Sequence, residues 1–229
     1  MKGIVVAIDG PAGAGKSTVS RRLASELGYH YVDTGAMYRV IGVLAAERGI
    51  DLANHAALAR LCDQISMEFI VEEGKFRVLA GGRDMSAAIR TPAAAQQASK
   101  TSAVPVVRER LVAKQREMGA DGGVVMEGRD IGTVVFPNAA VKVFLAASVD
   151  ERARRRACEL HSAPSSDQVA RIAAEIAERD ERDQNRAHSP LRPAADAIVV
   201  DTTKKNIEEV VQELRALATS RGAKLASHG

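Results

Sequence analysis

The stretch from Ile4 to Thr18 constrains the fold of this chain more than any other. An apolar run, IVVAI, ends at Asp9 and passes into GPAGAGKST, which fits the pattern G-x-x-x-x-G-K-[ST]. A continuous apolar run is typical of a buried parallel strand, and a helix-like stretch follows from Lys16 to Leu27. Glycines allow positive φ and a close approach of the backbone to a ligand. The order of strand, glycine-rich loop and helix therefore predicts an α/β fold with a P-loop.

The P-loop predicts a site for ATP together with Mg²⁺. Its backbone N–H groups form a nest for anions, and the amino end of the next helix adds the positive end of a dipole. The Lys16 ammonium can reach the β- and γ-phosphates, and the Ser17 hydroxyl can bind a Mg²⁺ held by the same phosphates. A glycine-rich turn with a solvated lysine is the alternative. The expected ATP-binding residues are Gly10, Pro11, Ala12, Gly13, Ala14, Gly15, Lys16, Ser17 and Thr18, with Ser17 as the metal ligand.

Composition limits what the chain can do. Its 229 residues suffice for a well-buried core, either as one large domain or as a core with small insertions. The 32 basic residues nearly balance the 29 acidic ones, and aromatic residues make up 3% with no Trp. A balanced charge and few aromatic rings argue against nucleic-acid binding, so we expect no nucleic-acid partner.

The remaining compositional signals point to the cytoplasm. No apolar run reaches the roughly 18 residues that a membrane-spanning helix needs, so we expect no membrane association. Cys62 and Cys158 lack a C-x-x-C spacing and are interpreted as ordinary reduced thiols. We expect a soluble cytoplasmic monomer.

Apolar strand-like runs alternate with amphipathic stretches along most of the chain. This alternation predicts a parallel sheet with helices on both faces. Residues 63–90 interrupt it with short runs separated by turns, which predict a small antiparallel subdomain. Ligands bind at the carboxyl ends of parallel strands. The sequence places four acidic positions or segments at such ends: Asp9, Asp33, Glu127–Asp130 and Asp201.

The charged residues favour a kinase over other P-loop proteins. The N-K-x-D sequence with which GTPases bind guanine is absent. Asp201 resembles the Walker-B acid of ATPases, but it follows the last predicted strand, far from the usual place of that acid. Arginine suits phosphate binding through its planar fork and permanent charge. Arginines occur after Asp33-Thr34-Gly35, in Gly128-Arg129-Asp130 and through residues 178–186, for which a solvated, salt-bridged helix is the alternative. The Arg152–Arg156 cluster precedes a Ser/Pro break and predicts a flexible cationic lid, or else a solvated helix face.

Four motifs occur together in this order: DGPAGAGKS from Asp9, DTGAMYR from Asp33, EGRDIGTVVFP from Glu127 and ERDERDQNR from Glu178. Over about residues 3–215 the chain resembles the bacterial cytidylate kinases, of the nucleoside monophosphate kinase group. The resemblance implies transfer of the γ-phosphoryl group of ATP to CMP or dCMP with Mg²⁺, giving ADP and CDP or dCDP, in pyrimidine nucleotide metabolism. Thr34 stands where serine is expected and Glu127 where aspartate is expected.

The resemblance also implies a division into a core, a monophosphate-binding region and a short lid. The core is expected to comprise residues 1–33, 106–150 and 188–220. The monophosphate-binding region is expected at 34–105, with the antiparallel insertion inside it, and the lid with its flanking helices at 151–187. Residues 221–229 are expected to form a disordered tail.

The roles of individual residues follow from the same resemblance. Cytosine contacts are expected from Thr34, Arg108 and Asp130, sugar contacts from Ser99, Arg179 and Asp183, and phosphate contacts from Arg39, Arg129 and Arg186. Arg152, which also contacts ATP, and Arg182 are expected to close over the transferring group. The catalytic set is Lys16, Arg129, Arg182 and Arg186. An Asp130 carboxylate would accept a hydrogen bond from the cytosine 4-amino group. The same carboxylate would face the O4 of uracil, which has no hydrogen to donate, so the resemblance implies a preference for CMP over UMP.

Two other functions stay open from the residues alone. One is a P-loop kinase with another small acceptor, such as adenylate, uridylate, shikimate or a sugar acid. The other is a nucleotide switch or RNA-binding ATPase, which would show salt-sensitive binding to nucleic acid.

Overall fold

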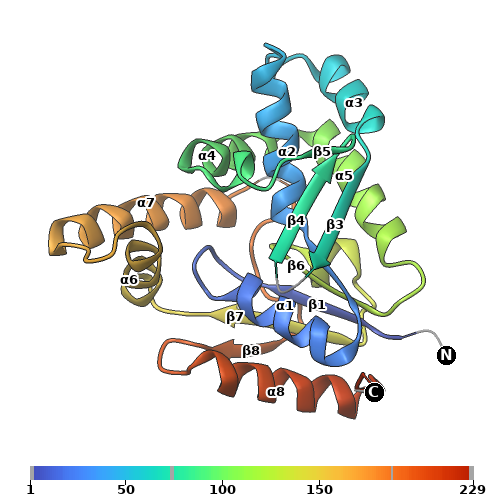
Figure 1. Cartoon of the computed structure of the whole chain (residues 1–229), viewed down its shortest axis with the longest axis vertical. Coiled ribbons are helices and arrows are strands. Elements are labelled where there is room, and N and C mark those ends of the chain that lie inside the picture. The colour runs from blue at the N-terminus through green and yellow to red at the C-terminus, as the bar shows by residue number, and fades with distance from the viewer. Residues whose placement is uncertain (1–2, 73–74, 187, 227–229) are drawn as a thin grey trace. The chain divides into compact units, whose positions relative to one another are not determined.

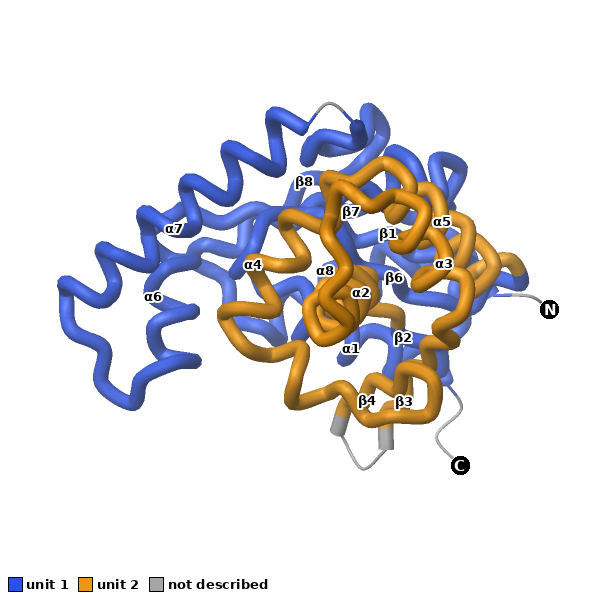
Figure 2. The backbone as a smooth tube through the Cα atoms, turned by 90° about the horizontal axis from the view of Figure 1, so that it is seen from above, with its two compact units in different colours: residues 1–31, 121–229 blue, residues 32–120 orange. Residues whose placement is uncertain are grey.

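The computed structural model describes residues 3–72, 75–186 and 188–226 (Figure 1). The chain divides into two compact units, one made of residues 1–31 and 121–229 and the other of residues 32–120 (Figure 2). Each unit is described by itself below. Among the described residues, no helix combines the length and the apolar character needed to cross a membrane.

The first unit contains a five-stranded sheet with the order β2-β6-β1-β7-β8. Its central strand β1 (Val5–Asp9) pairs in parallel with β6 (Val124–Gly128) and β7 (Val141–Ala146), and β7 pairs in parallel with β8 (Ile198–Asp201). The edge strand β2 (His30–Asp33) crosses the boundary between the units. Val6, Ala7 and Ile8 are fully buried, as a central parallel strand requires. The predicted α/β class with a parallel sheet is confirmed.

Four α-helices accompany this sheet in the first unit. They are α1 (Lys16–Leu27), α6 (Val149–Leu160), α7 (Ser166–Gln184) and α8 (Ile207–Ser220). Helices α1 and α8 pack side by side (Figure 1). Helices α6 and α7 pack on each other through a small apolar core of Ala153, Ala157, Ile172 and Ile176. Ser165 caps the amino end of α7 with a capping box. Its hydroxyl accepts the Gln168 backbone N–H, and the Gln168 side chain accepts the Ser165 backbone N–H.

The second unit joins helices to a small antiparallel sheet. Its helices are α2 (Thr34–Glu47), α3 (His55–Gln64), the 3₁₀ turn η1 (Ala88–Arg90), α4 (Pro92–Thr101) and α5 (Pro105–Met118). The sheet contains β3 (Met67–Glu72), β4 (Lys75–Ala80) and β5 (Arg83–Asp84), paired antiparallel in that order. This confirms the antiparallel insertion, although the turn expected at its first hairpin includes residues 73–74, which lie outside the described residues. Met37, Ile41, Leu58, Leu61 and Leu111 are central to its core.

The structure differs from the expected layout in three places. Helix α5, expected to belong to the core, packs against α3 inside the second unit. Of the expected disordered tail, residues 227–229 lie outside the described residues, but Ala223 is buried and the Ala226 N–H donates to the Glu26 carbonyl at 3.0 Å. A short π-helix, η2 (Ile131–Val135), which the sequence did not predict, follows β6.

Candidate active site

The P-loop connects β1 directly to α1, as the sequence predicts. Its glycines take backbone conformations that other residues avoid, with φ of 148° at Gly10, 78° at Gly13 and 87° at Gly15. A Cβ at Gly10 would lie 2.2 Å from the Leu145 carbonyl oxygen, so the neighbouring strand also excludes a side chain there. Backbone geometry favours glycine at all three positions, and packing adds a second requirement at Gly10.

Lys16 begins α1 and lies over the loop. Its side chain is 7% exposed, and its Nζ donates to the Pro11 carbonyl oxygen at 2.7 Å. The ammonium is therefore held at the loop that forms the anion nest. Ser17 and Thr18, which follow in the first turn of the helix, are exposed.

Arg152 supports the P-loop from α6. Its Nη1 donates to the Ala12 carbonyl oxygen at 3.1 Å, and its Nε donates to the Ala147 carbonyl oxygen at 3.0 Å. Its Nη2 lies 2.6 Å from Oδ2 of Asp180 on α7. The predicted lid arginine is thus buried against the loop, and these protein groups engage each of its three nitrogens.

Thr202, directly after β8, also contacts the P-loop. Its hydroxyl donates to the Ala14 carbonyl oxygen at 3.3 Å, and the Arg155 guanidinium donates to its hydroxyl and carbonyl oxygens at 3.1 and 2.6 Å. No local sequence pattern predicts this contact, because 188 positions separate the two partners. Asp201 lies on the edge strand, separated from β1 by β7, which agrees with the interpretation that it is no Walker-B acid.

Glu127 is an acidic residue at the carboxyl end of a strand next to the P-loop strand. It lies on β6, adjacent to the P-loop strand, and pairs in register with Ile8. Its buried carboxylate accepts a hydrogen bond from the Tyr31 hydroxyl. A carboxylate at this strand end serves the metal in P-loop enzymes.

Arg129 and the carboxyl-terminal part of α7 form a cluster around Asp183. The Arg129 Nε donates to Oδ2 of Asp183 at 3.0 Å. Burial favours the neutral form of Asp183, yet Arg129, Arg186 and Arg179 together hold the pKa of this carboxyl below its ordinary value. The structure therefore brings together four of the predicted substrate-binding residues. Unlike these residues, Arg182 has a half-exposed side chain, and its Nη2 lies 3.8 Å from Oε1 of Glu178.

The predicted substrate residues of the second unit lie on α2, α4 and α5. Asp33 caps α2 by accepting the Ala36 N–H at 2.9 Å, and its other oxygen binds Arg39 at 2.7 Å. Thr34 is buried in the first turn of the same helix. The Arg108 guanidinium lies 5.8 Å from the centre of the Tyr38 ring, in a cation–π arrangement. Ser99 is half-buried on α4.

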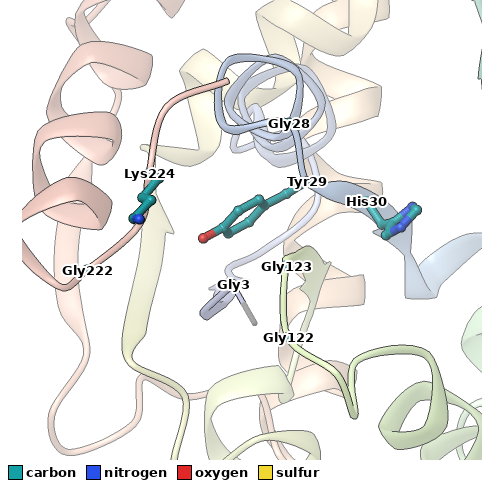
Figure 3. Close-up of a pocket in the computed structure, with 8 residues that line it drawn as sticks. All are labelled: Gly3, Gly28, Tyr29, His30, Gly122, Gly123, Gly222 and Lys224. Carbon is teal, nitrogen blue, oxygen red and sulfur yellow. The ribbon is translucent and has the colours of Figure 1, made fainter. Parts of the chain in front are cut away.

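A pocket of about 360 Å³ lies at the opposite, amino-terminal end of the sheet (Figure 3). It is lined by Gly3, Gly28, Tyr29, His30, Gly122, Gly123, Gly222 and Lys224. Its glycines serve backbone packing, since a Cβ at Gly122 would lie 1.9 Å from the Gly3 carbonyl oxygen. None of the predicted site residues lines this pocket.

Comparisons with known proteins give one consistent result. The family model described as cytidylate kinase matches residues 6–220. A cytidylate kinase from Geobacter sulfurreducens is 48% identical over 220 residues, covering 96% of this chain and 94% of that protein. Another cytidylate kinase, from Pelotomaculum thermopropionicum, is 50% identical over 212 residues, covering 92% of this chain and 94% of that protein. A crystal structure of an uncharacterized protein from Eubacterium ventriosum has a TM-score of 0.51 at 13% identity, covering 96% of this chain and 99% of that one, and shows a likeness of fold alone.

Proposed function

Since the chain belongs to the cytidylate kinase family and is a cytidylate kinase that uses ATP, we propose which of its side chains carry out each part of the reaction. The reaction is transfer of the γ-phosphoryl group of Mg·ATP to CMP or dCMP, giving ADP and CDP or dCDP. The observation that supports this assignment best is the cluster of Arg129, Arg179 and Arg186 around Asp183, in the same unit as the P-loop.

ATP binds at the P-loop in this proposal. The backbone N–H groups of the loop after Pro11 and the amino end of α1 bind the phosphates, and the Lys16 ammonium leaves the Pro11 carbonyl to reach the β- and γ-phosphates. Arg152 holds the loop in shape through the Ala12 carbonyl, and its predicted contact with ATP stays a prediction.

The residues at the P-loop fit a magnesium ion held mainly by phosphates and water. Mg²⁺ prefers oxygen ligands, keeps several waters and seldom binds in an all-protein cage. Ser17 offers an exposed hydroxyl, and Glu127 offers a buried carboxylate on the adjacent strand. Across the described ranges, no group of three or more His, Cys, Asp or Glu side chains could hold a metal, which agrees with such a site. When bound, Mg²⁺ would neutralise charge on the phosphate oxygens.

The family resemblance assigns the CMP contacts to individual residues. Thr34, Arg108 and Asp130 contact cytosine, Ser99, Arg179 and Asp183 contact the sugar, and Arg39, Arg129 and Arg186 contact phosphates. The arginine cluster supplies the positive charge that two phosphate groups require when they approach one another. Asp183 keeps its negative charge among these arginines and can accept hydrogen bonds from sugar hydroxyls.

The chemistry needs positioning and electrostatic stabilisation more than acid–base catalysis. The acceptor phosphate is already an anion, so no general base has to remove a proton. Arg182 on α7 is exposed and completes the positive charge when the lid closes over the transferring group.

An assay of ADP formation against a panel of acceptors tests the proposal. The acceptors are CMP, dCMP, UMP, AMP, shikimate and none, each with Mg·ATP. We expect rapid turnover with CMP and dCMP only. Rapid turnover with another acceptor would overturn the assignment of the base-binding residues, and ADP release without acceptor preference would indicate an ATPase. The monomeric state and cytoplasmic location stay predictions.

A further inference from the structure

Asp9 is the last residue of β1, directly before the P-loop, and has no role in the proposal above. Its Oδ1 accepts the Ile131 N–H at 2.8 Å, and its Oδ2 accepts the Gly132 N–H at 2.8 Å. The side chain is 4% exposed. Both donors belong to the first turn of η2, which begins immediately after Asp130.

These two hydrogen bonds connect parts of the chain that the sheet itself no longer joins. The parallel pairing of β1 with β6 ends at Asp9 and Gly128, so the backbone ladder stops where the functional segment begins. Beyond that point, the Asp9 carboxylate joins the strand leading into the P-loop to the backbone that follows Arg129 and Asp130. The partners are more than 120 positions apart in sequence, 122 and 123.

We propose, on the basis of the CMP contacts assigned above to Arg129 and Asp130, that Asp9 is a positioning residue of the phosphoryl transfer. By accepting both N–H groups, its carboxylate fixes the segment that carries Arg129 and Asp130 relative to the strand that carries the P-loop. Side chains that bind CMP are then held in a constant position with respect to the groups that bind the ATP phosphates. Small displacements of such groups have large effects on rate.

The alternative is that Asp9 merely stabilises the fold at this strand end. The energetics argue against it, because burial raises the pKa of Asp9 to about 6, above its ordinary value of 3.8. The folded protein is therefore less stable with Asp9 ionised than with Asp9 protonated. A residue that is unfavourable for stability yet well bonded is expected where function requires it.

Asp9→Asn separates the two explanations. Asparagine has the same shape, but its single carbonyl oxygen can accept one of the two N–H groups, and its amide nitrogen would face the other donor. We expect CMP binding, measured by calorimetry, and kcat/KM for CMP to fall by about tenfold or more. We expect the KM for ATP to change by less than about threefold. We also expect the melting temperature to equal or exceed that of the wild type.

Asp51→Asn is the matched control. Asp51 also accepts a backbone N–H, that of Ala53 at 2.9 Å, but in an exposed turn before α3. All of these measured values should stay at wild-type levels. Gly132→Ala is a second variant that perturbs the same contact from the other side, since the new Cβ would lie 3.4 Å from Oδ2 of Asp9 and 3.3 Å from Cδ of Lys142. It should weaken CMP binding in the same direction by a smaller factor.

Two results would overturn the positioning role. One is CMP binding and kcat/KM within threefold of the wild type in Asp9→Asn; the other is a parallel loss for ATP and CMP together with a lower melting temperature. Asp130→Ala, which removes every acceptor for the cytosine 4-amino group, distinguishes this failure from failure of the assigned CMP contacts. If Asp130→Ala weakens CMP binding and Asp9→Asn does not, the contacts stand and the positioning role is wrong. If Asp130→Ala leaves CMP binding unchanged, the assigned contacts are wrong.

Discussion

Arg152 and Asp180 form a buried ion pair, with 2.6 Å between Nη2 and Oδ2, that joins α6 to α7. Since Arg152 also donates to the Ala12 carbonyl oxygen, the pair connects α7 to the P-loop through one guanidinium group. Both residues are buried, since 4% of the surface of Arg152 and 8% of the surface of Asp180 is exposed. The conformation of the phosphate loop therefore depends on a residue far from it in sequence.

Asp180→Ala should destabilise the protein and weaken ATP binding. Removing one partner leaves the other charge buried without compensation, which typically costs about 3–5 kcal/mol. Urea unfolding measures the loss, and calorimetry with ATP measures the effect on the loop. Glu178→Ala is the control, because Glu178 is exposed and lies 3.8 Å from Arg182, so its removal should cost less than about 1 kcal/mol. Equal stabilities of the two variants would contradict a supporting role for the buried pair.

Lys16→Ala should remove most of the activity. The ammonium is the one charged side chain of the P-loop motif, and loss of a group that stabilises charge in the transition state typically lowers kcat by about 10²–10³. Steady-state kinetics and nucleotide binding measure the effect. Lys205→Ala serves as a control, since this exposed lysine pairs with Glu213 at 2.6 Å and has no assigned role in the reaction. An unchanged affinity for nucleotide in Lys16→Ala would contradict the assignment of the loop.

Asp130→Asn should reduce the discrimination between CMP and UMP. An asparagine amide can present its oxygen to the cytosine 4-amino group or its nitrogen to the O4 of uracil, so the penalty for uracil decreases. We expect the ratio of kcat/KM values for CMP and UMP to fall by about tenfold. Asp167→Asn, on the exposed first turn of α7, should leave the ratio unchanged. A wild-type enzyme that uses both nucleotides equally would show that Asp130 does not read the base.

The sequence predicts the elements of this fold well because the signals are local. The apolar run before Asp9, the glycines up to Gly15 and the amphipathic helices each follow from a few neighbouring residues. The hairpins between residues 66 and 85 likewise follow from short runs and turns, so the sequence predicts the antiparallel sheet. Helical spacing places Arg179 and Asp183 on one face of α7, whereas Arg186 follows the end of that helix and still acts on Asp183.

The site was harder to predict because its remaining contacts join distant parts of the chain. Glu127 lies beside the P-loop strand because β6 neighbours β1, and strand order depends on the packing of the whole unit. The bonds of Asp9 to η2 and of Thr202 to Ala14 have no local signature. Arg152 looks like a mobile lid residue in the sequence, yet it is buried because Asp180 and two backbone carbonyls compensate its charge.

The pH dependence of stability provides a test of the charge state of Asp9. Burial raises its pKa to about 6, and the nearby Asp130 carboxylate adds to this, whereas the two N–H groups of η2 and the Lys16 ammonium oppose it. The folded protein therefore binds this proton more tightly than the unfolded chain, in which the pKa is near the ordinary value of 3.8. The stabilising effect of protonation is complete below about pH 4 and is lost as the pH rises through about 6. The difference between the two pKa values corresponds to about 3 kcal/mol.

Asp9→Asn lacks this titration and keeps the other ionisable groups, so comparison with the wild type isolates the effect. We expect the free energy of unfolding of the wild type, relative to Asp9→Asn, to fall by about 3 kcal/mol between pH 4 and pH 7. Urea unfolding of both proteins across this range measures the difference, with Asp51→Asn as the variant that should follow the wild type. A difference that does not change with pH would contradict a buried Asp9 with a raised pKa. A fall of the expected size would mean that the protein keeps a charge beside its phosphate loop at the expense of stability, because the two N–H groups of η2 require a carboxylate.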